Sequence, residues 1–240
     1  MRHPITEKPV LHLPPAAAGV EVVRDLPYGD GLTYDRYGTG DTAMILVTGL
    51  PDPGAEARMG AKLKDWQSFS DWARLLATAG VTAITYANRA PADVFALIAH
   101  LRPQFARLAI WACSGHGPMA ISVLAREPLA AAVLLYPYTI DVDGGTTVAD
   151  AVAKWGFAPA GVELGALPTT VPILIGRAGA DAMPALLPGL DAFTAALEAR
   201  GAPVTVVDHP TGPHAYDLDD ASAEASKAIA RIVAFVRARG

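Results

Sequence analysis

The sequence has few charged residues and almost no cysteine. Of its 240 residues 18% are charged, and Cys113 is the single cysteine. One cysteine excludes a disulfide within the chain and suits a reducing compartment, so we expect a cytoplasmic protein. The formal net charge is -5, and the Lys and Arg residues are scattered. This balance disfavours nucleic acid and an anionic membrane surface as partners.

Several motifs are also missing. No apolar run approaches the ~20 residues that a membrane helix needs, and the first residues lack the apolar core of a signal peptide. There is no Cys/His metal spacing, no P-loop and no Gly-x-Gly-x-x-Gly, so we expect no metal and no cofactor. The chain is instead 52% hydrophobic, which is enough for one well-buried core.

Short apolar segments typical of strands alternate with segments of helical spacing. The strand-like segments are 20–25, 32–36, 44–48, 81–86, 108–112, 131–136, 171–176 and 204–207. The helix-like segments are 65–79, 92–101, 119–126, 148–155, 190–200 and 221–239. This alternation predicts an α/β fold: a mostly parallel, twisted sheet of about eight strands, flanked by helices and entered through an antiparallel hairpin.

Two segments stand outside this alternation. Residues 1–19 are rich in Pro and Ala, and we expect them to be loosely attached to a single domain formed by residues 20–240. Residues 137–168 have little strand character. We expect them to form a short, lid-like insertion over the carboxyl ends of the strands, where ligands bind in such sheets.

A strand, a tight turn and a helix meet in the stretch LAIWACSGHGPMA at residues 108–120. Ser114 lies in the turn, among small residues. A serine placed there is lifted out of the sheet, and the following backbone N–H groups point at the group that it attacks. Because serine is a weak nucleophile, it needs a histidine base and a carboxylate that orients the histidine.

The best base and acid lie in loops that follow later strands. His214 lies between the last strand and the last helix, from where it can reach the carboxyl edge of the sheet. Asp181 follows the strand at 171–176, and the alternatives Asp141 and Asp143 follow the strand at 131–136. Each residue alone also has a structural explanation, as a helix cap or a turn residue. Together they have the order nucleophile, acid and base.

Three segments carry a resemblance to a known family: ACSGHG at 112–117, RAGADAMP at 177–184 and TGPHAYD at 211–217. They resemble the α/β-hydrolase superfamily, and within it the dienelactone-hydrolase-like branch of small carboxylesterases. The resemblance implies that Ser114 is the nucleophile, that Asp181 orients His214, and that the substrate is a small carboxylic ester or lactone. The resemblance also allows a homodimer.

The oxyanion hole and the substrate pocket are expected beside the serine. The backbone N–H of Gly115 and that of Leu50, in the loop after the strand at 44–48, are the predicted oxyanion donors. Tyr136 and Tyr138 follow a strand, and Trp155 lies in the lid-like insertion. We expect these three side chains to line the pocket.

The serine motif departs from Gly-x-Ser-x-Gly at both glycines. Ala112 is a tolerable replacement for the first, but His116 is bulky at the second, although Gly117 can relieve the crowding. Shifting the motif by one residue makes Cys113 an alternative nucleophile. Two further alternatives remain: a non-catalytic ligand-binding protein with a distorted turn, and an acyltransferase or an amide or C–C bond hydrolase with the same three residues.

Overall fold

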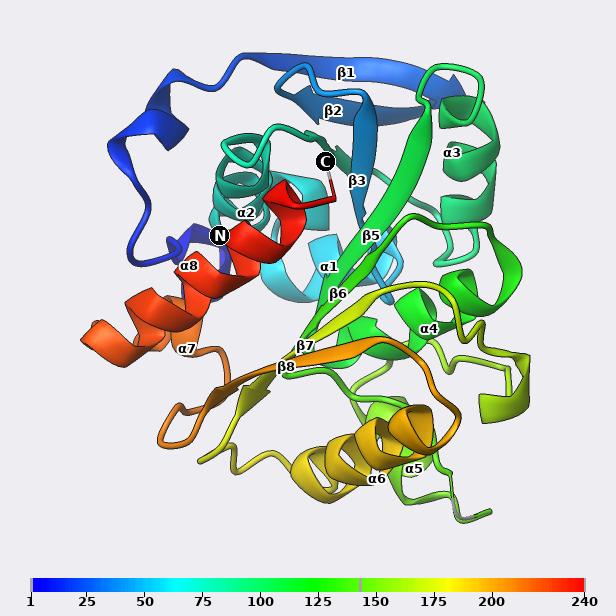
Figure 1. The fold of residues 1–240 in the computed structure, drawn as a ribbon. Coiled ribbons are helices and arrows are strands. Elements are labelled where there is room, and N and C mark those ends of the chain that lie inside the picture. The colour runs from blue at the N-terminus through cyan, green and yellow to red at the C-terminus, as the bar shows by residue number, and fades with distance from the viewer. Residues whose placement is uncertain (1, 143, 240) are drawn as a thin grey trace.

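A mixed sheet with helices on both faces forms the centre of the molecule (Figure 1). The computed structural model describes residues 2–142 and 144–239. Within them the strands are β1 (Val22–Gly29), β2 (Leu32–Tyr37), β3 (Thr42–Leu46), β4 (Thr82–Tyr86), β5 (Arg107–Cys113), β6 (Ala132–Leu135), β7 (Ile173–Ala178) and β8 (Val204–His209). The helices are α1 (Asp52–Met59), α2 (Gln67–Ala77), α3 (Asp93–Leu101), α4 (Gly117–Arg126), α5 (Thr147–Lys154), α6 (Leu186–Ala199), α7 (Tyr216–Asp219) and α8 (Ala223–Arg237).

The strand order is β1-β2-β4-β3-β5-β6-β7-β8. The β1–β2 and β2–β4 pairs are antiparallel, and every later pair is parallel. The predicted hairpin and the mostly parallel sheet are therefore confirmed. Every residue of β3, β4 and β6 is buried, as expected for strands that helices cover on both faces.

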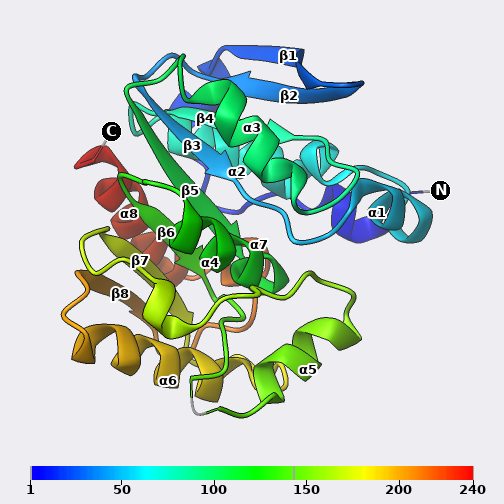
Figure 2. The same ribbon diagram turned by 90° about the vertical axis from the view of Figure 1, so that its right-hand side faces the viewer.

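Each face of the sheet has its own apolar core. Helices α3, α4 and α6 cover one face, and α2 and α8 cover the other (Figure 2). Trp72, on α2, and Trp111, on β5, are fully buried in the core between the sheet and the helices α2 and α8. None of the helices in the described part of the chain is long and apolar enough to cross a membrane.

The N-terminal residues differ from the expectation of a loosely attached segment. Val10 is buried, and its N–H donates to Asp71 Oδ2 at 3.0 Å. The N–H of Leu11 donates to the carbonyl of Asp217 at 2.8 Å. The segment is therefore held against α2 and α7, because it buries an apolar side chain and satisfies backbone groups there.

Candidate active site

Ser114 occupies the turn between β5 and α4. Its φ is +50°, in the left-handed region that a residue with a side chain adopts only under local constraint. The Ser114 carbonyl accepts a 2.9 Å hydrogen bond from the N–H of Tyr138, which ties the turn to the chain after β6. The predicted strand–turn–helix is thus present, with its serine in the strained conformation of a nucleophile elbow.

Gly117 provides the close approach that this turn needs. A Cβ on Gly117 would lie 2.1 Å from the Tyr138 carbonyl oxygen, so no larger residue fits without a backbone shift. Glycine is therefore required one position later than in Gly-x-Ser-x-Gly, and the His116 side chain at the usual glycine position points away to the Gly49 N–H and the rings of Phe69 and Phe157.

The structure brings the three predicted side chains together. Ser114 Oγ lies 2.8 Å from His214 Nε2, and His214 Nδ1 lies 2.6 Å from Asp181 Oδ2. The other oxygen of Asp181 accepts the N–H of Met183 at 2.8 Å. The Asp181 side chain is fully buried, whereas the His214 side chain is 25% exposed. The serine end of this chain of contacts is thus the end that a ligand can reach.

Backbone hydrogen bonds join the loops that carry Asp181 and His214. The N–H of Gly179 donates to the His209 carbonyl at 2.8 Å, and the N–H of Ala180 donates to the Gly212 carbonyl at 2.9 Å. A Cβ on Gly179 would lie 2.3 Å from the Pro210 carbonyl oxygen. This close pairing sets the distance between the carboxylate and the imidazole.

Cys113, the alternative nucleophile, lies at the end of β5. Burial, and secondarily the nearby Asp217, raise the pKa of its thiol. A thiol reacts as its thiolate, and this environment disfavours the thiolate. The side chain that contacts His214 Nε2 is that of Ser114.

Tyr136, predicted to line the pocket, lies instead against His214. The two rings are 5.0 Å apart in an edge-to-face arrangement. The Tyr136 hydroxyl donates to Asp217 Oδ1 at 2.6 Å, and Trp72 Nε1 donates to Asp217 Oδ2 at 2.6 Å. Burial raises the pKa of this Asp217 carboxyl, although both hydrogen bonds lower it. Tyr136 therefore supports the histidine from within the core.

The loop after β3 faces the serine turn, as predicted. His116 Nδ1 accepts the N–H of Gly49 at 2.8 Å, and Asn88 Nδ2 donates to the Leu50 carbonyl at 3.1 Å. The N–H of Leu50 donates no hydrogen bond within the described part of the chain. The N–H of Gly115 lies in a first helical turn, where such groups lack intrahelical acceptors. These two N–H groups are the predicted oxyanion donors.

An apolar cavity of about 220 Å³ opens above Ser114. Its lining residues are Leu50, Ala55, Arg58, Met59, Trp66, Ser114, Tyr138, Trp155, Phe157 and Met183. Tyr138 and Trp155 were predicted to line it. The contributions of α1 and Met183 were not predicted, although the Asp-Pro pair that opens α1 is a signal for a helix start.

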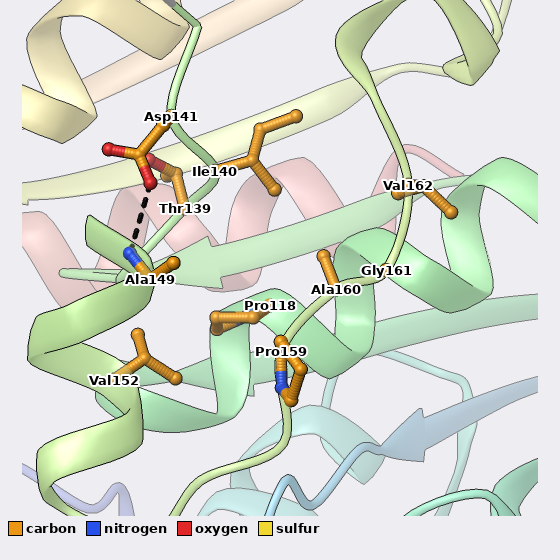
Figure 3. Close-up of a pocket in the computed structure, with 10 residues that line it drawn as sticks. All are labelled: Pro118, Thr139, Ile140, Asp141, Ala149, Val152, Pro159, Ala160, Gly161 and Val162. Carbon is orange, nitrogen blue, oxygen red and sulfur yellow. Dashed lines mark hydrogen bonds between the residues drawn. The ribbon is translucent and has the colours of Figure 1, made fainter. Parts of the chain in front are cut away.

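Asp141 lies away from His214 and caps a helix. Its carboxylate accepts the N–H groups of Val148 and Ala149 at 2.9 and 3.0 Å, at the start of α5. Figure 3 shows it beside a second cavity of about 200 Å³, between α4, α5 and residues 159–162. The alternative acid Asp143 lies outside the described residues.

The chain was compared with known proteins by sequence and by structure. No protein-family model matches it, and no curated protein matches it in sequence. An esterase of the bacterial hormone-sensitive lipase family is similar in structure, with a TM-score of 0.63, 19% identity, and coverage of 92% of this chain and 84% of that one. An esterase/lipase from an uncultured bacterium is similar with a TM-score of 0.66 and 18% identity, and the match covers 93% of this chain and 86% of that one.

A third similar structure is that of esterase B from Lactobacillus rhamnosis with a tributyrin phosphonate. Its TM-score is 0.61 and its identity 13%, and the match covers 94% of this chain and 87% of that one. These likenesses, together with the eight-stranded sheet and its flanking helices, show that the chain has the α/β-hydrolase fold.

Proposed function

We propose that this protein is a serine hydrolase of small carboxylic esters or lactones. One observation carries the proposal: the continuous hydrogen-bonded chain from Asp181 through His214 to Ser114, which ends at an apolar cavity. The esterase structures that share the fold support the reaction class. The resemblance of three short segments to dienelactone hydrolases supports the lactone as a substrate.

The reaction begins when His214 Nε2 takes the Ser114 proton as Oγ attacks the substrate carbonyl. The N–H groups of Gly115 and Leu50 bind the resulting oxyanion. His214 then protonates the leaving alcohol, which departs and leaves an acyl group on Ser114. A water molecule, deprotonated by His214, hydrolyses this ester and restores the enzyme. Asp181 stabilises the imidazolium that forms in both halves of the reaction.

The cavity supports a small, mostly apolar substrate. It is about 220 Å³ in volume, and Leu50, Trp66, Phe157 and Met183 form much of its wall. The one charged side chain that lines the cavity is that of Arg58. It donates hydrogen bonds to the carbonyls of Gly54 and Trp155. Short acyl chains fit these dimensions best.

Hydrolysis of p-nitrophenyl acetate and butyrate by the purified protein tests the proposal. We expect turnover by the native protein, loss to background in Ser114→Ala, and retained turnover in Cys113→Ala. Activity that survives Ser114→Ala and disappears in Cys113→Ala would assign the chemistry to the cysteine. A folded native protein without turnover on either ester would contradict the proposed function.

A further inference from the structure

His116 lies two residues after Ser114 but points to another loop. Its ring is buried, and Nδ1 accepts the N–H of Gly49, a residue 67 positions earlier in the chain, at 2.8 Å. Because Nδ1 is the acceptor, the ring proton is on Nε2. Burial lowers the pKa of His116 to about 3, so the ring is neutral and Nδ1 stays an acceptor near neutral pH.

Two aromatic rings hold the imidazole of His116 in place. Phe69 packs against it with centroids 5.5 Å apart, and Phe157 packs against it at 5.0 Å. Both contacts are edge-to-face, with interplanar angles of 89° and 88°. The direction of the Nδ1 lone pair is therefore set by packing, independently of Gly49.

Hydrogen bonds hold three consecutive peptide groups of the Gly49 loop. The first peptide group, which ends at the Gly49 nitrogen, donates its N–H to His116 Nδ1. The second, between Gly49 and Leu50, accepts a 2.8 Å hydrogen bond from the N–H of Ala158 at the Gly49 carbonyl. The third accepts from Asn88 at its Leu50 carbonyl, at 3.1 Å. The Gly49 carbonyl and the Leu50 N–H belong to the same planar trans peptide. The Leu50 N–H therefore points in the direction opposite to the Gly49 carbonyl.

The loop also lies directly against the serine turn. A Cβ on Gly49 would be 3.1 Å from the Gly115 carbonyl oxygen and 3.3 Å from the Cα of His116. The next residue after Leu50 is Pro51, which has no N–H. The Leu50 N–H is therefore the amide of this loop that remains available to a substrate oxygen.

We propose that His116 is a positioning residue, which holds the Gly49 amide so that the next amide, that of Leu50, points into the oxyanion hole. This inference rests on the proposed function, since an oxyanion forms only if Ser114 attacks a carbonyl. His116 thereby joins the loop of one oxyanion donor, Leu50, to the turn that carries the other, Gly115. The bulky residue at the second glycine position of the motif has a role of its own.

Two variants of similar size isolate the hydrogen bond. His116→Asn keeps an acceptor near the position of Nδ1, whereas His116→Leu has nearly the same shape without one. Both remove the imidazole ring that packs against Phe69 and Phe157. Misplacing a group by about 1 Å costs ~10²-fold in rate, and losing an oxyanion donor costs ~10²–10³-fold. We expect kcat to fall about 10–100-fold more in His116→Leu than in His116→Asn, with KM similar in the two.

The decisive measurements are kcat and KM of the native protein and the two variants on p-nitrophenyl butyrate. Equal kcat values in the Leu and Asn variants, or a change confined to KM, would overturn the inference. Amide exchange at Gly49, followed by NMR, is a readout that needs no turnover. We expect fast exchange in His116→Leu and protection in the native protein and His116→Asn, and equal exchange in all three would also overturn it.

The same set of proteins separates the two proposals. If the native protein hydrolyses no ester while Gly49 exchange differs between the Leu and Asn variants, the proposed function fails and the placement of the loop by His116 stands. If the native protein is active, Ser114→Ala is not, and the Leu and Asn variants turn over equally, the hydrolase assignment stands and the role of His116 fails.

Discussion

The ring of Phe157 lies directly on Gly115, the residue that follows Ser114, the proposed nucleophile. A Cβ built on Gly115 would be 2.4 Å from Cε2 of that ring. Phe157 belongs to the insertion after β6, whereas Gly115 belongs to the turn after β5. The insertion therefore covers Gly115, a proposed oxyanion donor, and glycine is required at this position as long as the phenyl ring is present.

This contact predicts coupling between the two positions. Gly115→Ala should lower kcat/KM by at least about tenfold, because the new methyl group displaces Phe157 or the turn. Phe157→Ala removes the obstacle, so adding Gly115→Ala to that variant should cost much less. A double-mutant cycle in kcat/KM measures the coupling. Equal costs of Gly115→Ala in the two backgrounds would show that the ring does not constrain the turn.

Asp181→Asn should lower kcat by ~10⁴-fold while the protein remains folded, because the neutral amide holds the wrong histidine tautomer and does not stabilise the imidazolium. Asp141→Asn is the matched control. Asp141 caps α5, so its replacement should cost ~1 kcal/mol of stability or less and leave kcat unchanged. Wild-type kcat in Asp181→Asn would remove Asp181 from the proposed mechanism.

His116 should make the free energy of unfolding fall as the pH is lowered. Its pKa is about 3 in the folded protein, and an unperturbed histidine has a pKa of ~6.5. Between pH ~3 and ~6.5 the unfolded chain therefore binds a proton at His116 that the folded protein does not bind. The free energy of unfolding is therefore unaffected by the titration of His116 above pH ~6.5, and it falls by up to about 1.4 kcal/mol per pH unit below that pH.

Urea unfolding at several pH values between 7 and 4 measures this loss, with His116→Asn as the reference that cannot titrate. The native protein should show the steeper fall in the free energy of unfolding. Parallel curves for the two proteins would mean that the imidazole is protonated in the fold, and so would contradict its role as an acceptor for Gly49.

Tyr136→Phe should destabilise the protein by about 1–3 kcal/mol, because it leaves the buried Asp217 carboxyl without one of its two side-chain donors. Tyr138→Phe is the comparison. Its hydroxyl donates to the carbonyl of Pro184 in a partly buried site, so we expect a smaller loss. Chemical denaturation measures both. A larger loss for Tyr138→Phe would show that the Tyr136–Asp217 contact contributes little.

Much of the sheet could be predicted from local pattern. The apolar run at 44–48 predicts a buried strand, and β3 is Thr42–Leu46. The exchange of β3 and β4 in the strand order could not be predicted, because Ile45 pairs with Ile84 on one side and Ile110 on the other. Such pairing depends on contacts between distant segments.

The same distinction applies to the candidate site. Ser114, Asp181 and His214 follow strands in short loops, so sequence and fold class suffice to place them at one edge of the sheet. Helix α1 was missed because only Asp52 and Ala55 in it are buried, which leaves little apolar periodicity. The contacts of His116 with Gly49 and Phe157 join segments far apart in the chain, and no local pattern encodes them.

We propose that Ser114 is the activated nucleophile. Incubation with a fluorophosphonate, followed by mass spectrometry of the digested protein, tests it directly and needs no knowledge of the natural substrate. We expect one adduct, on the peptide that contains Ser114, and none in Ser114→Ala. An adduct on Cys113, or none on the folded native protein, would contradict it.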